Sequence, residues 1–263
     1  MYFGFDNISV QYGKKRVLSD INAEFPRGEI ITIIGQNGCG KSSLLKTVPR
    51  AVKPSKGRVV FEDKSLDTYN RKAIAQKIAY LPQVHSPPSD IDVRTLVSYG
   101  RYPHARFGRG MTRADADIID EALELTGLTA LRYRILSTLS GGERQRAWIA
   151  MTITQQPQIL ILDEPTTYLD VSYQLEVLEL IRGLNKKLGI TIIMVLHDLN
   201  MAARYSDKLY VIKNAACVLK GAPRDVLTRL VLRDVFEIDA EIFEDKTNGC
   251  PYFIPIKIKE RSI

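Results

Sequence analysis

The sequence GQNGCGKS, residues 35–42, decides the fold of this chain. It fits the pattern G-x-x-x-x-G-K-[ST], in which backbone N–H groups curl around a phosphate chain and the next helix points the positive end of its dipole at it. Chance would place this pattern in a chain of this length about one time in a hundred. Residues 30–34 (IITII) are typical of a buried strand, and residues 42–48 of a helix that Pro49 stops. We therefore expect a strand, a phosphate-binding loop and a helix, in that order.

Length and composition indicate an ordinary globular protein. The 263 residues suffice for one large α/β core and a subsidiary domain. No apolar run approaches the roughly 18 residues of a membrane helix, and the start of the chain lacks the layout of a secretory signal, so we expect a cytoplasmic protein. The net charge of +7 admits nucleic acid, anionic lipid or a nucleotide as partner without choosing among them. Three cysteines are too few for a disulfide framework or a zinc site.

The phosphate loop itself contains one of these cysteines, Cys39. Backbone N–H groups and Lys41 should favour its thiolate. We expect alkylation of Cys39 to block nucleotide binding.

The chain before and after the loop alternates between strands and helices. Residues 3–25 predict antiparallel strands, and Tyr12, at a strand end, could stack on an adenine, although plain packing is the commoner role of such a tyrosine. A short strand is expected at 58–61, and another ends at 80–83. Residues 93–156 have a helical pattern, with Thr112 and Asp115 forming a capping box, and we interpret this region as an inserted helical domain.

The segment LSGGERQ, residues 139–145, marks the start of a helix near the end of this region. Ser140 would be the N-cap and Glu143 its capping-box partner. Glycines at 141 and 142 weaken the first turn but clear side chains from a dipole end that can hold an anion. A second phosphate-binding helix start is therefore expected here.

Polar side chains follow two further buried strands. Asp163 and Glu164 follow the apolar run at 159–162 (ILIL), and His197 follows the run at 191–196. A helix over 171–184, closed by Gly189, connects these strands, which should therefore be parallel. Open α/β sheets bind ligands at the carboxyl ends of their strands, so we interpret His197 as functional rather than structural. Beyond it we expect strands at 209–212, 217–219 and 252–258 and short helices over 226–236, with no further chemistry.

Taken together, these motifs resemble those of the ATP-binding-cassette (ABC) ATPases over nearly the whole chain. The resemblance rests on GQNGCGKS, Gln83, LSGGERQ, ILILDE, the loop TTYLD (166–170) and His197, in the family's order and approximate spacing. It implies an α/β P-loop fold with a parallel sheet, an N-terminal antiparallel β subdomain and an inserted helical subdomain. The implied division is a core of 1–83 and 157–235, a helical subdomain at 84–156 and a C-terminal extension at 236–263. The Pro-Pro after Gln83 and the Asn214-Ala215 turn without glycine depart from the family.

The resemblance also implies a role for each motif residue. Glu164 would act as general base, Gln83 would sense metal and water, His197 would contact the γ-phosphate, and Ser42, Gln83 and Asp163 would serve Mg²⁺. Lys41 would hold the phosphates. The residues implied to bind ATP, across both subunits of a dimer, are Tyr12, Gly35, Gln36, Asn37, Gly38, Cys39, Gly40, Lys41, Ser42, Ser43, Ser140, Gly141, Gly142 and Asp170.

Partners follow from the same resemblance. In the family two ATP molecules are sandwiched in a head-to-tail dimer, and a separate permease, fed by a substrate-binding protein, crosses the membrane. We expect the chain on the cytoplasmic face of the inner membrane, with 84–109 and the aromatic residues Tyr99, Tyr102 and Phe107 against the permease. The motifs VSYGRYPH (97–104) and EPTTYLD (164–170) resemble importers of ferric siderophores, haem and cobalamin. The transported substrate itself is not encoded in this chain.

Three alternatives remain. An ABC ATPase acting on nucleic acid or ribosomes fits the basic charge, but DNA-repair relatives need long coiled coils and translation-factor relatives carry two cassettes. A non-catalytic regulator is disfavoured by intact Lys41, Asp163, Glu164 and His197. The subunit of another importer or of an exporter also fits.

Overall fold

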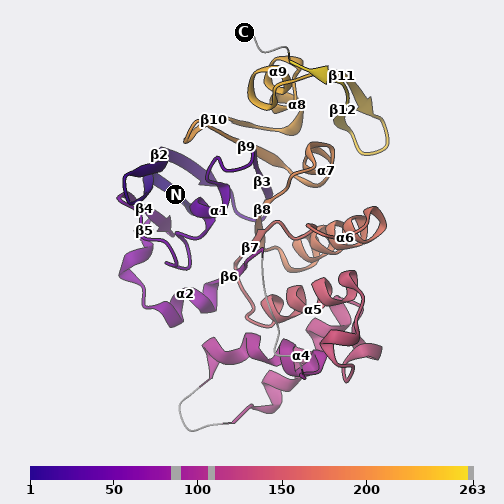
Figure 1. The fold of residues 1–263 in the computed structure, drawn as a ribbon. Helices are drawn as coiled ribbons and strands as arrows, with labels where there is room; N and C mark the ends of the chain where they lie inside the picture. The colour runs from indigo at the N-terminus through magenta and orange to yellow at the C-terminus, as the bar shows by residue number, and fades with distance from the viewer. Residues whose placement is uncertain (84–89, 106–109, 260–263) are drawn as a thin grey trace. The chain divides into compact units, whose positions relative to one another are not determined.

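The chain forms two units in the computed structural model, which describes residues 1–83, 90–105 and 110–259 (Figure 1). Unit 1 comprises Met1–Thr68 and Ile193–Ile263, and unit 2 comprises Tyr69–Ile192. Strand β8 (Thr191–Val195) contains residues of both. Within the described residues, no helix combines the length and apolarity that crossing a membrane requires. The division into subdomains expected from the sequence stays a prediction.

Unit 1 begins with a four-stranded antiparallel sheet in the order β2-β1-β4-β5. Its strands are β1 (Phe3–Tyr12), β2 (Lys15–Phe25), β4 (Lys56–Phe61) and β5 (Lys64–Ser65). Phe3, Phe5 and Phe25 are fully buried, and the rings of Phe5 and Phe25 meet edge to face at a centroid distance of 5.5 Å. This aromatic cluster contributes to the core of unit 1, and the antiparallel strands predicted at 3–25 are confirmed.

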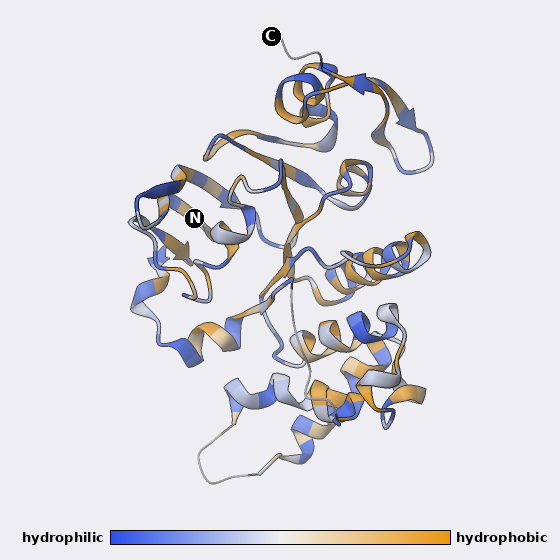
Figure 2. Ribbon diagram, viewed as in Figure 1, coloured by the Kyte–Doolittle hydropathy of each residue, from blue (hydrophilic) through white to orange (hydrophobic). Residues whose placement is uncertain are grey.

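The strand before the phosphate loop is β3 (Ile30–Gly35). It pairs in parallel with β9 (Lys208–Lys213), which pairs antiparallel with β10 (Ala216–Gly221). Residues 30–34 of β3 are buried, as expected for a continuous apolar and β-branched run in a parallel sheet. The strand is drawn mostly in the orange of hydrophobic residues in Figure 2. The predicted strands at 209–212 and 217–219 are confirmed by β9 and β10.

The helix after the loop, α1 (Lys41–Leu45), is shorter than the helix expected over 42–48. The N–H of Thr47 bonds to Leu44 O at 3.1 Å, and the N–H of Val48 bonds to Leu45 O at 3.1 Å. Bonds to the third residue back tighten the chain into turns, so the α-helix ends before Pro49. A 3₁₀ turn, η1 (Leu66–Thr68), ends this part of unit 1.

The carboxyl-terminal part of unit 1 contains three short helices and a hairpin. They are α7 (Leu199–Tyr205), α8 (Pro223–Val226), α9 (Arg229–Phe236) and the antiparallel strands β11 (Ile238–Asp245) and β12 (Cys250–Ile258). The helices expected near 226–236 and the strand expected at 252–258 are confirmed. Sequence reasoning did not predict α7 or β11.

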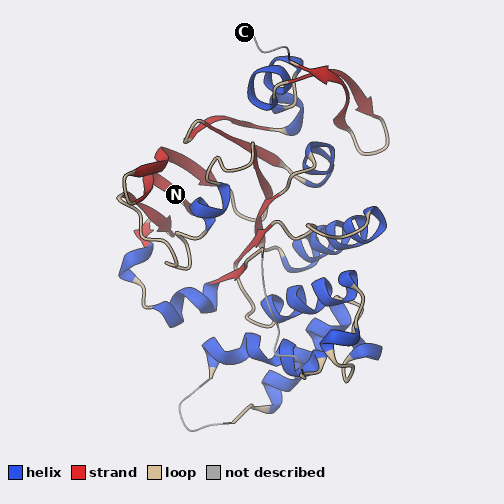
Figure 3. Ribbon diagram, viewed as in Figure 1, coloured by secondary structure: helices blue, strands red, loops and turns tan. Residues whose placement is uncertain are grey.

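Unit 2 contains two parallel strands, β6 (Ile78–Leu81) and β7 (Ile159–Asp163), preceded by the helix α2 (Arg71–Lys77). Between the strands, the described residues are mostly helical (Figure 3). The elements are α3 (Val93–Ser98), η2 (Tyr99–His104), α4 (Arg113–Leu125), η3 (Thr129–Leu131), η4 (Leu136–Thr138) and α5 (Gly141–Ile153). Helix α6 (Val171–Leu188) follows β7.

Three predicted helix ends are confirmed in unit 2. Thr112 and Asp115 form a capping box at α4, and Ser140 and Glu143 form one at α5. Gly189 closes α6 in the left-handed conformation, with φ 64°.

A buried arginine joins three elements of unit 2. Arg101, in η2, is 9% exposed, and its Nε lies 2.8 Å from Asp115 Oδ1 at the start of α4. Its Nη1 donates to Thr154 O at 2.7 Å, just beyond α5. Hydrogen bonds from the Thr112 hydroxyl and backbone N–H, followed by the Arg101 guanidinium, lower the pKa of Asp115 to about 2.

Candidate active site

The phosphate loop connects β3 and α1 in unit 1. Its glycines stand at positions where a side chain would clash or where the backbone adopts positive φ. A Cβ on Gly35 would lie 2.2 Å from Ile212 O, so the loop starts where β3 runs close to the backbone of β9. Gly40 is the N-cap of α1 with φ 104°, in the left-handed region that favours glycine. Gly38 also has positive φ, 76°, and a Cβ there would meet no atom within 4 Å. The strand, loop and helix expected from the sequence are thus present in that order.

Lys41 lies across the loop. Its side chain is buried, with 5% exposure, and Nζ donates to Gly35 O at 2.8 Å and to Gln36 O at 3.0 Å. Cys39 Sγ is 3.9 Å from the same nitrogen, and its side chain is partly exposed. The loop therefore holds a cation and a thiol side by side.

Tyr12 contacts the same region of unit 1. The residue is 49% exposed at the end of β1, and its hydroxyl lies 3.4 Å from Ser43 Oγ in α1. An exposed aromatic ring fixed beside the loop helix fits a stacking surface better than core packing.

His197 stands between β8 and α7 in unit 1. It is exposed and is followed by Asp198, which caps α7 by accepting a hydrogen bond from the Met201 N–H at 2.9 Å. The turn that carries His197 is therefore fixed on one side by a capped helix start.

In unit 2, Asp163 lies at the end of β7 and is 2% exposed. The hydroxyl of Tyr80, on the neighbouring strand β6, donates to Asp163 Oδ2 at 3.3 Å. Burial, and then the charge of Asp163, raise the pKa of Tyr80, so the phenol stays protonated and remains a donor. Sequence reasoning missed Tyr80, whose only signal was its place three residues before Gln83.

The next residue, Glu164, has an unusual backbone conformation, with φ 56°. Its Oε2 accepts hydrogen bonds from Gln83 Nε2 at 2.5 Å and from Thr167 Oγ1 at 3.0 Å. The structure thus brings together Glu164 and Gln83, two of the residues expected in the site. Thr167 was not singled out as a site residue from the sequence.

The segment LSGGERQ begins α5. The Ser140 side chain accepts from the Glu143 N–H at 3.2 Å, and the Ser140 N–H donates to Glu143 Oε2 at 2.8 Å and thereby lowers the pKa of Glu143. A Cβ on Gly142 would lie 2.5 Å from the Tyr173 ring of α6. A glycine at 142 is therefore needed for the packing of α5 against Tyr173, in addition to the space for an anion that the sequence led us to expect. Asp170, the N-cap residue of α6, is exposed and makes no side-chain capping bond.

The motif residues fall into two sets. The phosphate loop, Tyr12 and His197 belong to unit 1, whereas Gln83, the carboxylates of 163–164, the start of α5 and Asp170 belong to unit 2. Each set is locally ordered by the contacts given above. Of the aromatic residues expected against a permease, Tyr99 and Tyr102 stack at a centroid distance of 5.1 Å, and Phe107 lies outside the described residues.

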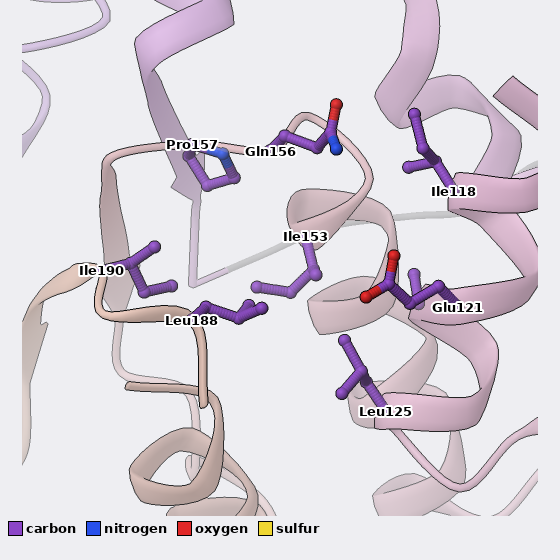
Figure 4. Close-up of a pocket in the computed structure, with 9 residues that line it drawn as sticks. Ile118, Glu121, Leu125, Ile153, Gln156, Pro157, Leu188 and Ile190 are labelled. Atoms are coloured by element: carbon purple, nitrogen blue, oxygen red, sulfur yellow. The ribbon is translucent and has the colours of Figure 1, made fainter. Parts of the chain in front are cut away.

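A cavity of about 220 Å³ in unit 2 lies apart from the motifs (Figure 4). It is lined by residues of α4 and by the ends of α5 and α6 with the residues that follow them, among them Leu125, Ile153 and Leu188. None of the motif residues lines it, so it has no part in the site.

The sequence is similar to characterised transport proteins over most of its length. A family model described as ABC transporter matches residues 18–167. Petrobactin import ATP-binding protein FpuC of Bacillus anthracis is 43% identical, over 93% of this chain and 89% of that protein. Iron(3+)-hydroxamate import ATP-binding protein FhuC of Bacillus subtilis (strain 168) is 44% identical, over 94% and 91%. Ferric enterobactin transport ATP-binding protein FepC of Escherichia coli (strain K12) is 39% identical, over 95% and 93%.

Solved structures give the same likeness. An inward-facing ABC transporter described as of the metal-chelate type matches with a TM-score of 0.84 and 27% identity, covering 97% of this chain and 98% of the other. The cbiO1 protein of Clostridium perfringens, part of the ABC transporter complex cbiONQ, matches with a TM-score of 0.76 and 30% identity, covering 88% and 92%.

Proposed function

The chain belongs to the ABC transporter family, and from this premise we propose that it is the ATP-hydrolysing subunit of an importer for iron–siderophore complexes. The relatives FpuC, FhuC and FepC are ATP-binding proteins for petrobactin import, iron(3+)-hydroxamate import and ferric enterobactin transport. They are 39–44% identical to this chain over more than nine-tenths of its length. That likeness is the observation that carries the proposal.

The phosphate loop fits the triphosphate of ATP. Residues 35–43 supply backbone N–H groups, the glycine at 38 leaves open space, and the Lys41 ammonium supplies positive charge. The bonds from Lys41 to two loop carbonyls hold this ammonium within the loop. We propose that Tyr12 stacks on the adenine, since its ring is exposed and fixed to Ser43.

Magnesium bound with ATP needs one or two protein ligands, and phosphate oxygens and water supply the rest. Within 1–83, 90–105 and 110–259, no cluster of three or more His, Cys, Asp or Glu could hold a metal alone. We propose that the Ser42 hydroxyl and the buried Asp163 carboxylate serve this ion, with Gln83 beside it. Oxygen donors are the ligands that Mg²⁺ prefers, so the donor set fits.

Glu164 is the proposed general base. Hydrogen bonds from Gln83 and Thr167 orient its carboxylate, and we propose that this carboxylate accepts the proton of the attacking water. Bound magnesium and the loop would neutralise charge on the γ-phosphate, which is the chemistry that the metal supplies. His197 would contact the same phosphate and hold the base in place.

The start of α5 is proposed to complete the site of a second copy. Ser140, Gly141 and Gly142 lie at the N-terminus of a 13-residue helix whose capping box is formed within one chain. We propose that they bind the γ-phosphate held by the other copy, with Asp170 at the interface, so that ATP joins the two copies and hydrolysis releases them.

The remaining partners are proposed from the family. A membrane permease would contact the surface near Tyr99 and Tyr102, whose stacked rings are presented at η2, and a substrate-binding protein would deliver the cargo to it. The chain would then act at the cytoplasmic face of the inner membrane.

The test is to recover the tagged chain from membranes, identify the permease that copurifies, and measure uptake in cells that lack the chain. We expect uptake of ferric siderophores to be lost and to return with the wild-type chain, but not with a Glu164→Gln variant. Loss of haem or cobalamin uptake with normal siderophore uptake would contradict the substrate class. Copurification with ribosomes or nucleic acid in place of a permease would contradict transport altogether.

A further inference from the structure

Helix α7 begins two residues after His197 and is attached to the carboxyl-terminal hairpin by one side chain. The Asn200 amide makes two hydrogen bonds to the backbone of Phe253 in β12. Phe253 N–H donates to Asn200 Oδ1 at 2.9 Å, and Asn200 Nδ2 donates to Phe253 O at 3.1 Å. The amide thus bonds to β12 as a neighbouring strand would.

The sequence of β12 suits this attachment. Backbone groups of alternate residues point to the same edge of a strand, so those of Pro251 and Pro255 share the outer edge with Phe253. Neither proline has an N–H, so along residues 251–255 of this edge the only N–H belongs to Phe253, and it is bonded to Asn200. The edge is built to receive a single side-chain amide rather than another strand.

A second residue of α7 carries a charge that acts on the hairpin. The charge of Arg204, one helical turn after Asn200, helps to lower the pKa of Asp245 in β11, after the larger effect of the Asn248 hydrogen bond. Helix α7 packs against β12 and also against β3, the strand that enters the phosphate loop. The hairpin therefore contacts α7 through the Asn200 amide and through the packing of β12 on the helix.

We propose that Asn200 is a positioning residue for His197, and that the hairpin β11–β12 braces the helix that carries this histidine's turn. Asp198 caps α7, so any movement of the first turn of α7 moves the segment that contains His197. The proposal rests on the proposed function, in which His197 acts in ATP hydrolysis. It gives residues 238–258 a task in hydrolysis that their sequence does not suggest.

The test compares Asn200→Ala with a matched variant, Asn22→Ala. Asn22, in β2, also bonds through its amide to two backbone groups, the Asn7 N–H and Asp20 O, each at 3.0 Å. Both variants lose a similar set of hydrogen bonds in unit 1. We expect Asn200→Ala to lower kcat for ATP by about tenfold with KM changed less than about twofold, because a misplaced catalytic group affects turnover more than binding. Asn22→Ala should keep the wild-type kcat.

A second variant guards against misfolding. Asn200→Asp is nearly isosteric and keeps the acceptor for the Phe253 N–H, but it places a carboxylate oxygen against Phe253 O, so its kcat should fall as well. The chain has three histidines, so the imidazole NMR signal of His197 can be assigned with a His197→Ala variant. That signal should shift in Asn200→Ala and stay in place in Asn22→Ala.

The outcomes separate the two proposals. If His197→Ala keeps full turnover, the assigned role of His197 is wrong and the inference falls with it. If His197→Ala abolishes turnover while Asn200→Ala keeps kcat and the His197 signal unchanged, only the positioning role is wrong. A lower kcat in Asn22→Ala equal to that in Asn200→Ala would reduce the effect to general destabilisation and overturn the inference.

Discussion

Glu164 combines a strained backbone with a restrained side chain. A positive φ of 56° is uncommon for glutamate, and such conformations concentrate at functional sites. Gln83 and Thr167 both bond to Oε2, which fixes the direction of the carboxylate. The pair of carboxylates after β7 was predictable from sequence. Its restraints were not, because Gln83 is 81 residues away in sequence and the bond from Thr167 depends on how the loop after β7 turns.

The hydroxyl group of Tyr80 gives a first prediction. Tyr80→Phe removes the donor to the buried Asp163 carboxylate, a loss of about 1 kcal/mol of interaction. If Asp163 serves magnesium, we expect the Mg²⁺ concentration for half-maximal ATPase activity to change by roughly fivefold, since 1 kcal/mol corresponds to about that factor. Titrating Mg²⁺ at saturating ATP measures it. Tyr133→Phe, which alters a tyrosine that is 73% exposed, is the control. Identical titration curves for all three proteins would refute the role.

Cys39 yields a second prediction. Its Sγ lies 3.9 Å from Lys41 Nζ, so a maleimide adduct would occupy the space beside the ammonium that we propose to bind phosphate. We expect N-ethylmaleimide to abolish binding of a fluorescent ATP analogue to the wild-type chain. Cys39→Ala should keep binding after the same treatment, although Cys217 and Cys250 remain. Full ATPase activity after complete modification of Cys39 would show that the thiol lies away from the nucleotide.

At the scale of elements, Arg101 joins η2, α4 and α5 of unit 2. Its partners are 14 and 53 residues away in sequence, so no local pattern could predict this contact. The capping boxes and the left-handed Gly189 were predictable because each depends on neighbours within a few residues. Helix α7 and strand β11 were missed because α7 has only seven residues, and because β11 depends on pairing with β12.

Arg101→Met should destabilise the chain. The substitution keeps most of the side-chain volume but removes a buried cation that is bonded to Asp115 and to Thr154 O, so we expect a loss of about 3 kcal/mol in the free energy of unfolding. Arg94→Met, at a more exposed pair with Asp120, should lose about 0.5 kcal/mol. Urea unfolding followed by circular dichroism measures both. Equal losses in the two variants would mean that the Arg101 contacts are of no special importance to unit 2.

At the scale of the whole molecule, the motifs taken together, in their order along the chain, predicted the fold and the family better than any single motif. The predicted α/β P-loop fold of an ABC ATPase is confirmed by the likeness to solved structures, and the family by relatives such as FhuC. Sequence order alone was sufficient for this, because each motif follows a buried strand or begins a helix. The cargo could not be read from the chain, because relatives named for different siderophores are all similar to it.

The most direct test of the account is the size of the Glu164→Gln variant with and without Mg·ATP. Glutamine keeps the shape of the side chain but cannot accept a proton, so turnover should fall by more than about a hundredfold while ATP still binds. Bound ATP should then hold two copies together. Size-exclusion chromatography with light scattering should show a monomer without nucleotide and a dimer with Mg·ATP. A variant that still hydrolyses ATP at the wild-type rate, or that stays monomeric with ATP bound, would contradict the central claim.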